Sequence, residues 1–159
     1  MDALWTSQRM RCESFLTLQP HYNLIHRGEY ERELEGVAQK YELGVLPYSP
    51  LAGGFLTGKY RPGSPPPPDS RGAKSGRVQG YLGSEFCRRV LERVEQVARK
   101  KGVSPSQVSL AWLLVRPSVT SPIIGPKNLE QLKDNLASTE VRLSQDEVAE
   151  LNEASAYSN

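Results

Sequence analysis

Three short apolar segments alternate with stretches of helical periodicity, and this alternation limits the possible folds more than any other feature. The segments cover residues 15–19, 45–48 and 122–125. Strands that alternate with helices pair in parallel, and ligands bind beyond the carboxyl ends of such strands. Each segment ends in polar or glycine-containing sequence, so we expect a ligand site at that edge. Three parallel strands make neither a closed barrel nor a sheet with protected edges, so the sequence predicts an α/β fold that is incomplete by itself.

The second apolar segment leads into a turn with the residues of a ligand site. Residues 45–46 suit a buried strand, Pro50 ends it, and Gly53 and Gly54 let backbone N–H groups approach a ligand. Tyr48 would offer a flat ring for stacking and a hydroxyl for a hydrogen bond. The alternative is a loop that only connects two elements.

Five stretches predict helices. The first spans roughly residues 29–41, and the second begins at Ser84 and ends at Gly102, a residue type that commonly follows the last helical turn. A third begins at Ser104-Pro105, which are typical N-cap and first-turn residues, and ends at Pro117.

Two further helices follow the third apolar segment. In the first, Leu129, Leu132 and Leu136 recur at helical spacing and are expected to face the core. The second begins with Ser144 and Glu147, the spacing of a capping box.

Residues 55–83 read as one long irregular loop. Four consecutive prolines occupy positions 65–68, and glycines recur on both sides of them. Loops of this length in a compact domain are usually lids, binding loops or disordered tethers.

Composition narrows the classes of partner. The 20 Lys and Arg against 18 Asp and Glu give a net charge of +2 with both signs interspersed, so the sequence indicates no nucleic-acid or membrane-binding surface. Cys12 and Cys87 stand far apart, without a signal peptide, which predicts reduced thiols and a cytoplasmic protein. Neither cysteine pairs with His21 or His26 in a zinc-binding pattern, so no metal site is expected.

The sequence from about residue 15 to 153 resembles the aldo-keto reductase superfamily, from the sixth strand of its (β/α)₈ TIM barrel to the C-terminus. The subgroup it resembles includes bacterial oxidoreductases, aflatoxin-aldehyde reductases and the β subunits of voltage-gated potassium channels. The motifs that carry the resemblance are Gln19-Pro20-His21-Tyr22-Asn23-Leu24-Ile25, Pro47-Tyr48-Ser49-Pro50-Leu51-Ala52-Gly53-Gly54, Thr57-Gly58-Lys59-Tyr60, Ser70-Arg71, and Ile124-Gly125-Pro126-Lys127 followed by Gln131 and Asp134-Asn135.

The resemblance implies an NADP(H) site. In the family, the residue matching Gln19 hydrogen-bonds the nicotinamide carboxamide, and the residue matching Tyr48 stacks on the nicotinamide ring. Lys59 and Arg71 would close over the pyrophosphate from the long loop, which would act as a cofactor belt. The residues that would wrap the pyrophosphate are Ser49, Pro50, Leu51, Ala52 and Gly53. The residues that would hold the adenosine and its 2′-phosphate at a helix start are Gly125, Lys127, Gln131, Asp134 and Asn135.

Several of these residues also have structural interpretations. Gln131 lies three residues after Asn128 and could complete a capping box. Asp134 and Asn135 could form an ordinary polar helix face. The Lys59 and Arg71 side chains could be solvated loop charges. Gln19 could bond a neighbouring backbone group, and His21 and His26 are interpreted as surface or packing residues.

The acid–base residues of the family have no counterpart in this chain. They are an Asp, a Tyr, a Lys and a His from the first four strands, and the Ser-Asn pair after the fifth strand has no counterpart either. The resemblance therefore predicts the NADP(H)-binding C-terminal portion of an aldo-keto reductase, inactive alone, which would act on a small carbonyl substrate only within a complete barrel. The alternatives are a nucleotide-binding or interaction module that docks on a partner, and an incomplete gene model. Exposed strand edges predict self-association or binding of a partner through these edges.

Overall fold

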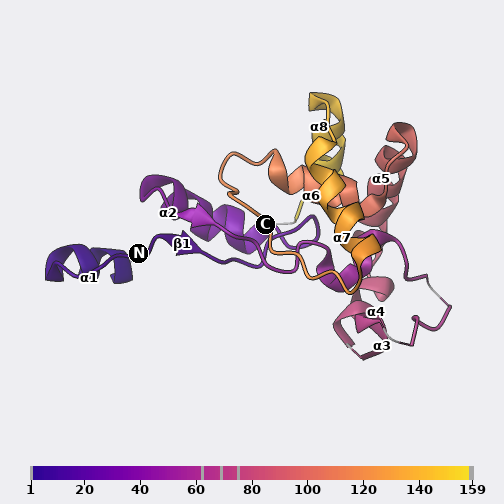
Figure 1. Ribbon diagram of the computed structural model, residues 1–159, viewed down its shortest axis with the longest axis horizontal. Helices are drawn as coiled ribbons and strands as arrows, with labels where there is room; N and C mark the ends of the chain where they lie inside the picture. Colours follow the sequence, from indigo (N-terminus) through magenta and orange to yellow (C-terminus); the bar gives the residue numbers. More distant parts are fainter. Residues whose placement is uncertain (1, 62, 69, 75, 158–159) are drawn as a thin grey trace.

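The computed structural model describes residues 2–61, 63–68, 70–74 and 76–157 (Figure 1). The two strands are β1 (Thr17–Leu18) and β2 (Gly44–Val45). The α-helices are α1 (Asp2–Met10), α2 (Glu35–Lys40), α3 (Arg71–Lys74), α4 (Gly76–Gly83), α5 (Glu85–Lys101), α6 (Pro105–Leu114), α7 (Leu129–Leu136) and α8 (Gln145–Ala154). The shorter helical turns are the π-helical η1 (Tyr30–Leu34) and the 3₁₀ turns η2 (Ala52–Thr57) and η3 (Ala137–Glu140).

The molecule is elongated, with helices at both ends and the strands between them (Figure 1). Figure 1 shows α5 to α8 grouped at one end, with α3 and α4 beside them, whereas α1 stands apart at the other end. The strands and α2 lie between these ends. α5 packs against both α6 and α8, and α6 also packs against α7 and η2. The helix α1 was not predicted from the sequence.

The sheet consists of β1 and β2 in parallel, with Thr17 opposite Gly44 and Leu18 opposite Val45. The pairing continues irregularly, because Tyr48 N donates to the Pro20 carbonyl at 3.0 Å. Parallel pairing is as predicted. The first strand is shorter than the predicted residues 15–19, since residues 15–16 lie outside β1 and are exposed.

The third apolar segment runs beside β2 but is not a strand, which corrects the prediction of a short buried strand at residues 122–125. Thr120 N donates to Val45 O at 2.9 Å and Ile123 N to Pro47 O at 2.8 Å. Pro122 and Pro126 have no N–H to contribute to a ladder. Ile123 is 43% exposed, so the segment is an irregular, partly exposed stretch hydrogen-bonded beside β2 and not a buried strand.

The helix start signals are confirmed. Ser84, Ser104 and Ser144 each accept a hydrogen bond from the N–H three residues later, and Ser144 with Glu147 completes the capping box. Gly102 ends α5 with φ +67°. The helix α6 ends at Leu114, three residues before the predicted end at Pro117.

The stretch 55–83 is less irregular than predicted. It contains the end of η2 and two helices, α3 and α4. Val78 and Tyr81 of α4 are buried, and this packing outweighs the low helix propensity of Gly76 and Gly80, where an added Cβ would meet nothing within 4 Å. Residues 62, 69 and 75 of this stretch lie outside the described residues.

The inward face of α7 is also different from the prediction. Leu129 and Leu136 are 64% and 54% exposed, whereas Asn135 is buried. The reason is that α7 meets α6 through polar contacts, in which the Asp134 carboxylate accepts hydrogen bonds from Ser104 and Gln107. Among the described helices, none combines the length and the apolar character needed to cross a membrane.

Candidate functional site

The turn after β2 has an unusual backbone. Ser49, Ala52, Gly53 and Gly54 all have positive φ, at 53°, 50°, 67° and 92°. For the two residues with a Cβ, this conformation costs roughly 1–2 kcal/mol each. Strain of this kind clusters at ligand sites, where alternating backbone conformations point N–H groups into a concavity suited to anions.

A buried asparagine fixes this turn to the loop after β1. Asn23 Nδ2 donates to Ser49 O at 2.9 Å, and Asn23 Oδ1 accepts from the N–H groups of Ile25 and His26 at 3.0 and 3.1 Å. Both the oxygen and the nitrogen of the Asn23 amide therefore have partners within the protein. The side chain holds Ser49 in place without facing a ligand itself.

Tyr60 connects the turn to the segment that was predicted as a belt. Its hydroxyl donates to Gly53 O at 3.3 Å and accepts from Gly72 N at 3.0 Å. A Cβ at Gly72 would lie 2.5 Å from the Tyr60 ring, so this position requires glycine. These contacts place Lys59 and Arg71, the immediate neighbours of Tyr60 and Gly72, at the edge of the turn.

The start of α7 forms the opposite wall. Gln131 N donates to Asn128 Oδ1 at 2.9 Å, and Gln131 Oε1 accepts from Lys127 N at 3.0 Å. The amide oxygen thus serves the helix start much as in the capping-box interpretation. Both Asp134 oxygens accept hydrogen bonds, from Ser104 Oγ at 3.0 Å and Gln107 Nε2 at 2.8 Å, so this carboxylate has a structural role.

These walls enclose a groove of about 410 Å³. Of the predicted cofactor residues, all line this groove except Ala52, which lines a neighbouring cavity, and Gln19, which is exposed and lines neither. The lining residues that the prediction omitted are Gly54, Thr57, Ser106, Ile123, Ile124 and Pro126. Most of them lie within or beside the predicted motifs, but Ser106 comes from α6, and no local sequence signal points to it.

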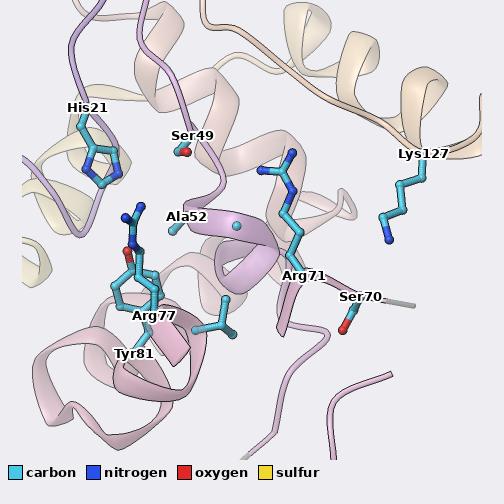
Figure 2. Close-up of a pocket in the computed structure, with 10 residues that line it drawn as sticks. His21, Ser49, Ala52, Ser70, Arg71, Arg77, Tyr81 and Lys127 are labelled. Carbon is cyan, nitrogen blue, oxygen red and sulfur yellow. The ribbon is translucent and has the colours of Figure 1, made fainter. Parts of the chain in front are cut away.

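The neighbouring cavity, of about 220 Å³, adjoins the groove, because Ser49, Gly53, Arg71 and Lys127 line both spaces. Figure 2 shows His21, Arg77 and Tyr81 on one side, Arg71, Ser70 and Lys127 on the other, and Ser49 and Ala52 between them. His21 was interpreted as a surface or packing residue, and Arg77 and Tyr81 were not singled out at all. Arg77 and Tyr81 reach this cavity because α4 packs against η2, which the sequence does not indicate.

The His21 ring stacks on Tyr48, and the His26 ring lies tilted beside His21. The His21 ring lies 4.9 Å from Tyr48 and 4.1 Å from His26, and His26 Nε2 is 2.9 Å from the Tyr81 hydroxyl. Burial, with the positive charge of Arg77 and the neighbouring His26, lowers the pKa of His21 to about 4. Burial also lowers the pKa of His26. Both rings are therefore neutral at neutral pH.

The groove is suited to an anionic ligand with a flat ring. Three basic residues line it, Lys59, Arg71 and Lys127, against one carboxylate that already accepts two hydrogen bonds. Tyr48 is 39% exposed and offers part of its ring to the groove. Within the described residues, no three His, Cys, Asp or Glu side chains gather closely enough to hold a metal ion.

Comparison with known proteins identifies the family. The chain is 33% identical over 147 residues to the uncharacterized oxidoreductase YrpG of Bacillus subtilis, covering 92% of this chain and 42% of that protein. It is 34% identical to a putative voltage-gated potassium channel subunit beta of Schizosaccharomyces pombe (77% of this chain, 36% of that protein). It is also 34% identical to the L-glyceraldehyde 3-phosphate reductase of Escherichia coli O157:H7 (85% and 40%).

The chain spans about two fifths of the length of these curated relatives. Over this length the match is continuous, because the description Aldo/keto reductase family fits residues 2–156. Members of that family use nicotinamide cofactors and fold as (β/α)₈ barrels, and the two parallel strands and the helices seen here are consistent with part of such a barrel. The chain belongs to the aldo/keto reductase family.

Proposed function

We propose that this chain is the C-terminal, NADP(H)-binding part of an aldo-keto reductase barrel. One observation carries the proposal: residues from the turn after β2, from the belt and from the start of α7 line a single groove, although they are up to 87 positions apart in sequence (135 − 48). The positive φ values of the turn and the three basic residues of the groove both favour a phosphate-bearing ligand.

Each wall of the groove would hold a different part of the cofactor. Tyr48 would stack on the nicotinamide, and the backbone N–H groups of the turn would face the pyrophosphate. Arg71 Nη2 lies 3.8 Å from the position of a Cβ on Gly125, so the belt reaches across to the third segment and could close over the pyrophosphate. Lys127 and the start of α7 would receive the 2′-phosphate. When bound, NADPH supplies the hydride that such enzymes transfer to a carbonyl carbon.

A fluorescence titration of NADPH and NADH against the full chain tests the proposed groove. Lys127→Glu is expected to weaken NADPH much more than NADH, because only NADPH carries the 2′-phosphate. Lys133→Glu, at an exposed position of α7, is the matched control and should change both affinities little. Equal losses for both cofactors in Lys127→Glu would remove Lys127 from the 2′-phosphate site, and no NADPH binding even with the missing strands supplied would reject the proposal.

We also propose that the chain alone does not catalyse carbonyl reduction. Among the described residues that line the groove, no pair is suited to protonate a carbonyl oxygen, and general acid–base catalysis typically contributes about 10²–10⁴-fold. The expected result is no reduction of 4-nitrobenzaldehyde by NADPH above background. Clear turnover that is lost in Tyr48→Phe would instead make Tyr48 the acid.

The second candidate is an interaction module without enzymatic activity, and the exposed apolar residues at the N-terminal end favour it. Trp5, Met10, Phe15 and Leu16 are each more than 60% exposed. One relative carries a name of a potassium channel subunit. Mixing the chain with a separately expressed segment that holds the first five strands of a close relative separates the candidates. A barrel-sized complex that binds NADPH would support the first candidate, whereas no complex would favour the second. For either, we propose a cytoplasmic location.

A further inference from the structure

The smaller cavity beside the groove has a wall that the nucleotide proposal does not use. Arg71 and Lys127 line both spaces, but His21, Ser70 and Arg77 line only the smaller one. Figure 2 shows the guanidinium groups of Arg71 and Arg77 pointing the same way on either side of Ser49. The turn after β2 therefore has a cationic side chain on each flank, and only the Arg71 flank belongs to the groove.

The charge of this cavity is strongly one-sided. Arg71, Arg77 and Lys127 line it, and no acidic side chain does so among the described residues. The printed sequence is nearly balanced, with 20 basic and 18 acidic residues, so two arginines in one small cavity are a local concentration of positive charge. Guanidinium groups bind phosphate and carboxylate oxygens in a two-pronged geometry that other cations cannot match.

A buried hydroxyl gives independent support. Ser70 is 6% exposed and lines the cavity, and its Oγ has no hydrogen-bond partner among the described residues. A buried hydroxyl without a partner is unfavourable, so such groups usually serve a ligand or a water. His21 adds a neutral ring nitrogen, which can donate a hydrogen bond without a charge of its own.

The cavity is also large enough to hold a small anion. A single water molecule needs only about 10–15 Å³ of such space. A cavity of about 220 Å³ therefore has room for a phosphate group and several waters.

We infer that this cavity is a second anion subsite, which binds a phosphate group between Arg71 and Arg77 next to the nucleotide groove. The inference goes beyond the proposed function, because Arg77, Ser70 and His21 have no role in holding NADP(H) there. The phosphate could belong to a separate phosphorylated molecule or to the diphosphate of a nucleotide that reaches over the turn. Both sources offer the same chemistry to the two arginines.

An NMR titration of the full chain with inorganic phosphate, at constant ionic strength, tests this subsite. The ring signals of His21 should shift on phosphate addition. Arg77→Gln should weaken this phosphate binding about tenfold, the loss expected for one charge-assisted contact, and Arg77→Lys should recover part of it. Arg88→Gln is the matched control, because Arg88 is exposed on α5 and does not line the cavity.

A repeat of the titration with saturating NADP⁺ distinguishes the two sources. Phosphate that still shifts His21 would show a subsite for a separate phosphorylated molecule. Phosphate displaced by NADP⁺, together with weaker NADP⁺ binding in Arg77→Gln, would assign the subsite to the nucleotide diphosphate. No His21 shift, or equal effects of Arg77→Gln and Arg88→Gln, would overturn the inference. The first titration, with phosphate alone, does not depend on NADP⁺ binding, so the groove proposal can fail separately from this inference.

Discussion

Trp112 and Trp5 are the two tryptophans of the chain. They lie in two regions that differ in how far apolar side chains are buried. Trp112 in α6 is fully buried, its Nε1 donates to Asn152 Oδ1 at 2.9 Å, and the Arg27 and Arg116 guanidinium groups lie over its ring. Trp5 in α1 is 63% exposed. The residues around Trp112 form a closed core, whereas those around Trp5 have an apolar surface without a comparable cover.

The two regions differ in how much of the surface of their helices and strands is covered by other parts of the chain. The helices α5, α6 and α8 bury their apolar faces against one another, and each has its own cap residue. The strand β1 pairs with β2 on one edge only, within the described residues. Parallel strands in barrels are covered on both faces and both edges. The first region thus covers its apolar faces within this chain, whereas β1 leaves one edge unpaired among the described residues.

The largest expected effect is the difference between the two tryptophans. Trp112→Ala should lower the free energy of unfolding by about 3–5 kcal/mol, because it leaves a large cavity and removes the partner of Asn152. Trp5→Ala is the matched control and should change it by less than about 0.5 kcal/mol. Urea unfolding followed by circular dichroism measures both. If both variants lost the same free energy of unfolding, Trp5 would have to be buried by contacts that this structure does not show.

The ion-pair network beside Trp112 provides the next effect. Glu31 accepts hydrogen bonds from Tyr22 Oη at 2.7 Å and from Arg27 Nε at 2.8 Å, and Arg116 approaches to 3.5 Å. Glu31→Gln should cost about 2 kcal/mol, since it leaves two nearly buried guanidinium groups poorly paired. Glu92→Gln, at an exposed position of α5, is the control.

The same network predicts a pH dependence. Burial raises the pKa of Glu31, but the hydrogen bonds from Arg27 and Tyr22 outweigh burial and hold the pKa below its usual value of 4.5. The stabilisation is therefore fully present above about pH 4.5 and is lost as the pH falls through the lower pKa of the folded state. The difference in stability between wild type and Glu31→Gln should shrink on acidification. A constant difference down to the acid limit would contradict this assignment.

The sequence predicted those parts of the molecule that depend on local chemistry. The caps at Ser84, Ser104 and Ser144 each need only the residue itself and the N–H three positions later, so their spacing is legible in the sequence. The turn after β2 was legible for the same reason, because Gly53 and Gly54 adopt the positive φ values that favour glycine.

The sequence failed where contacts between distant elements decide the outcome. Leucines at helical spacing predicted an apolar inner face for α7, but Asp134 turns toward Ser104, 30 positions away. The third apolar segment has the residues of a strand but too few paired N–H groups to form one. His21 and Arg77 line the same cavity because α4 forms within a stretch that the sequence predicts to be a loop.

A smaller effect concerns the exposed region itself. The isolated chain should self-associate, because Leu16 is 79% exposed beside the open edge of β1. Leu16→Lys should reduce this association, since charged residues on edge strands oppose pairing with another chain. Leu129→Lys, at an exposed leucine of α7, is the control. Light scattering that shows a monomer of 17.7 kDa for the wild type would contradict the conclusion that the exposed region around β1 promotes association.

The smallest effect concerns His21, which lies where the strands meet α4. Its pKa of about 4 results first from burial, then from His26 and then from Arg77. Because the folded pKa lies below the ordinary value of 6.5, protonation favours the unfolded chain, and His21 reduces stability progressively as the pH falls from about 6.5 to about 4. Arg77→Gln removes the weakest of the three causes, so the His21 pKa should rise modestly and this loss of stability should lessen. An NMR titration of the His21 ring in wild type, Arg77→Gln and Arg88→Gln measures the rise. A pKa that stays unchanged in Arg77→Gln would place the guanidinium too far from the ring to share an anion with it, whereas a rise in both variants would reflect net charge alone.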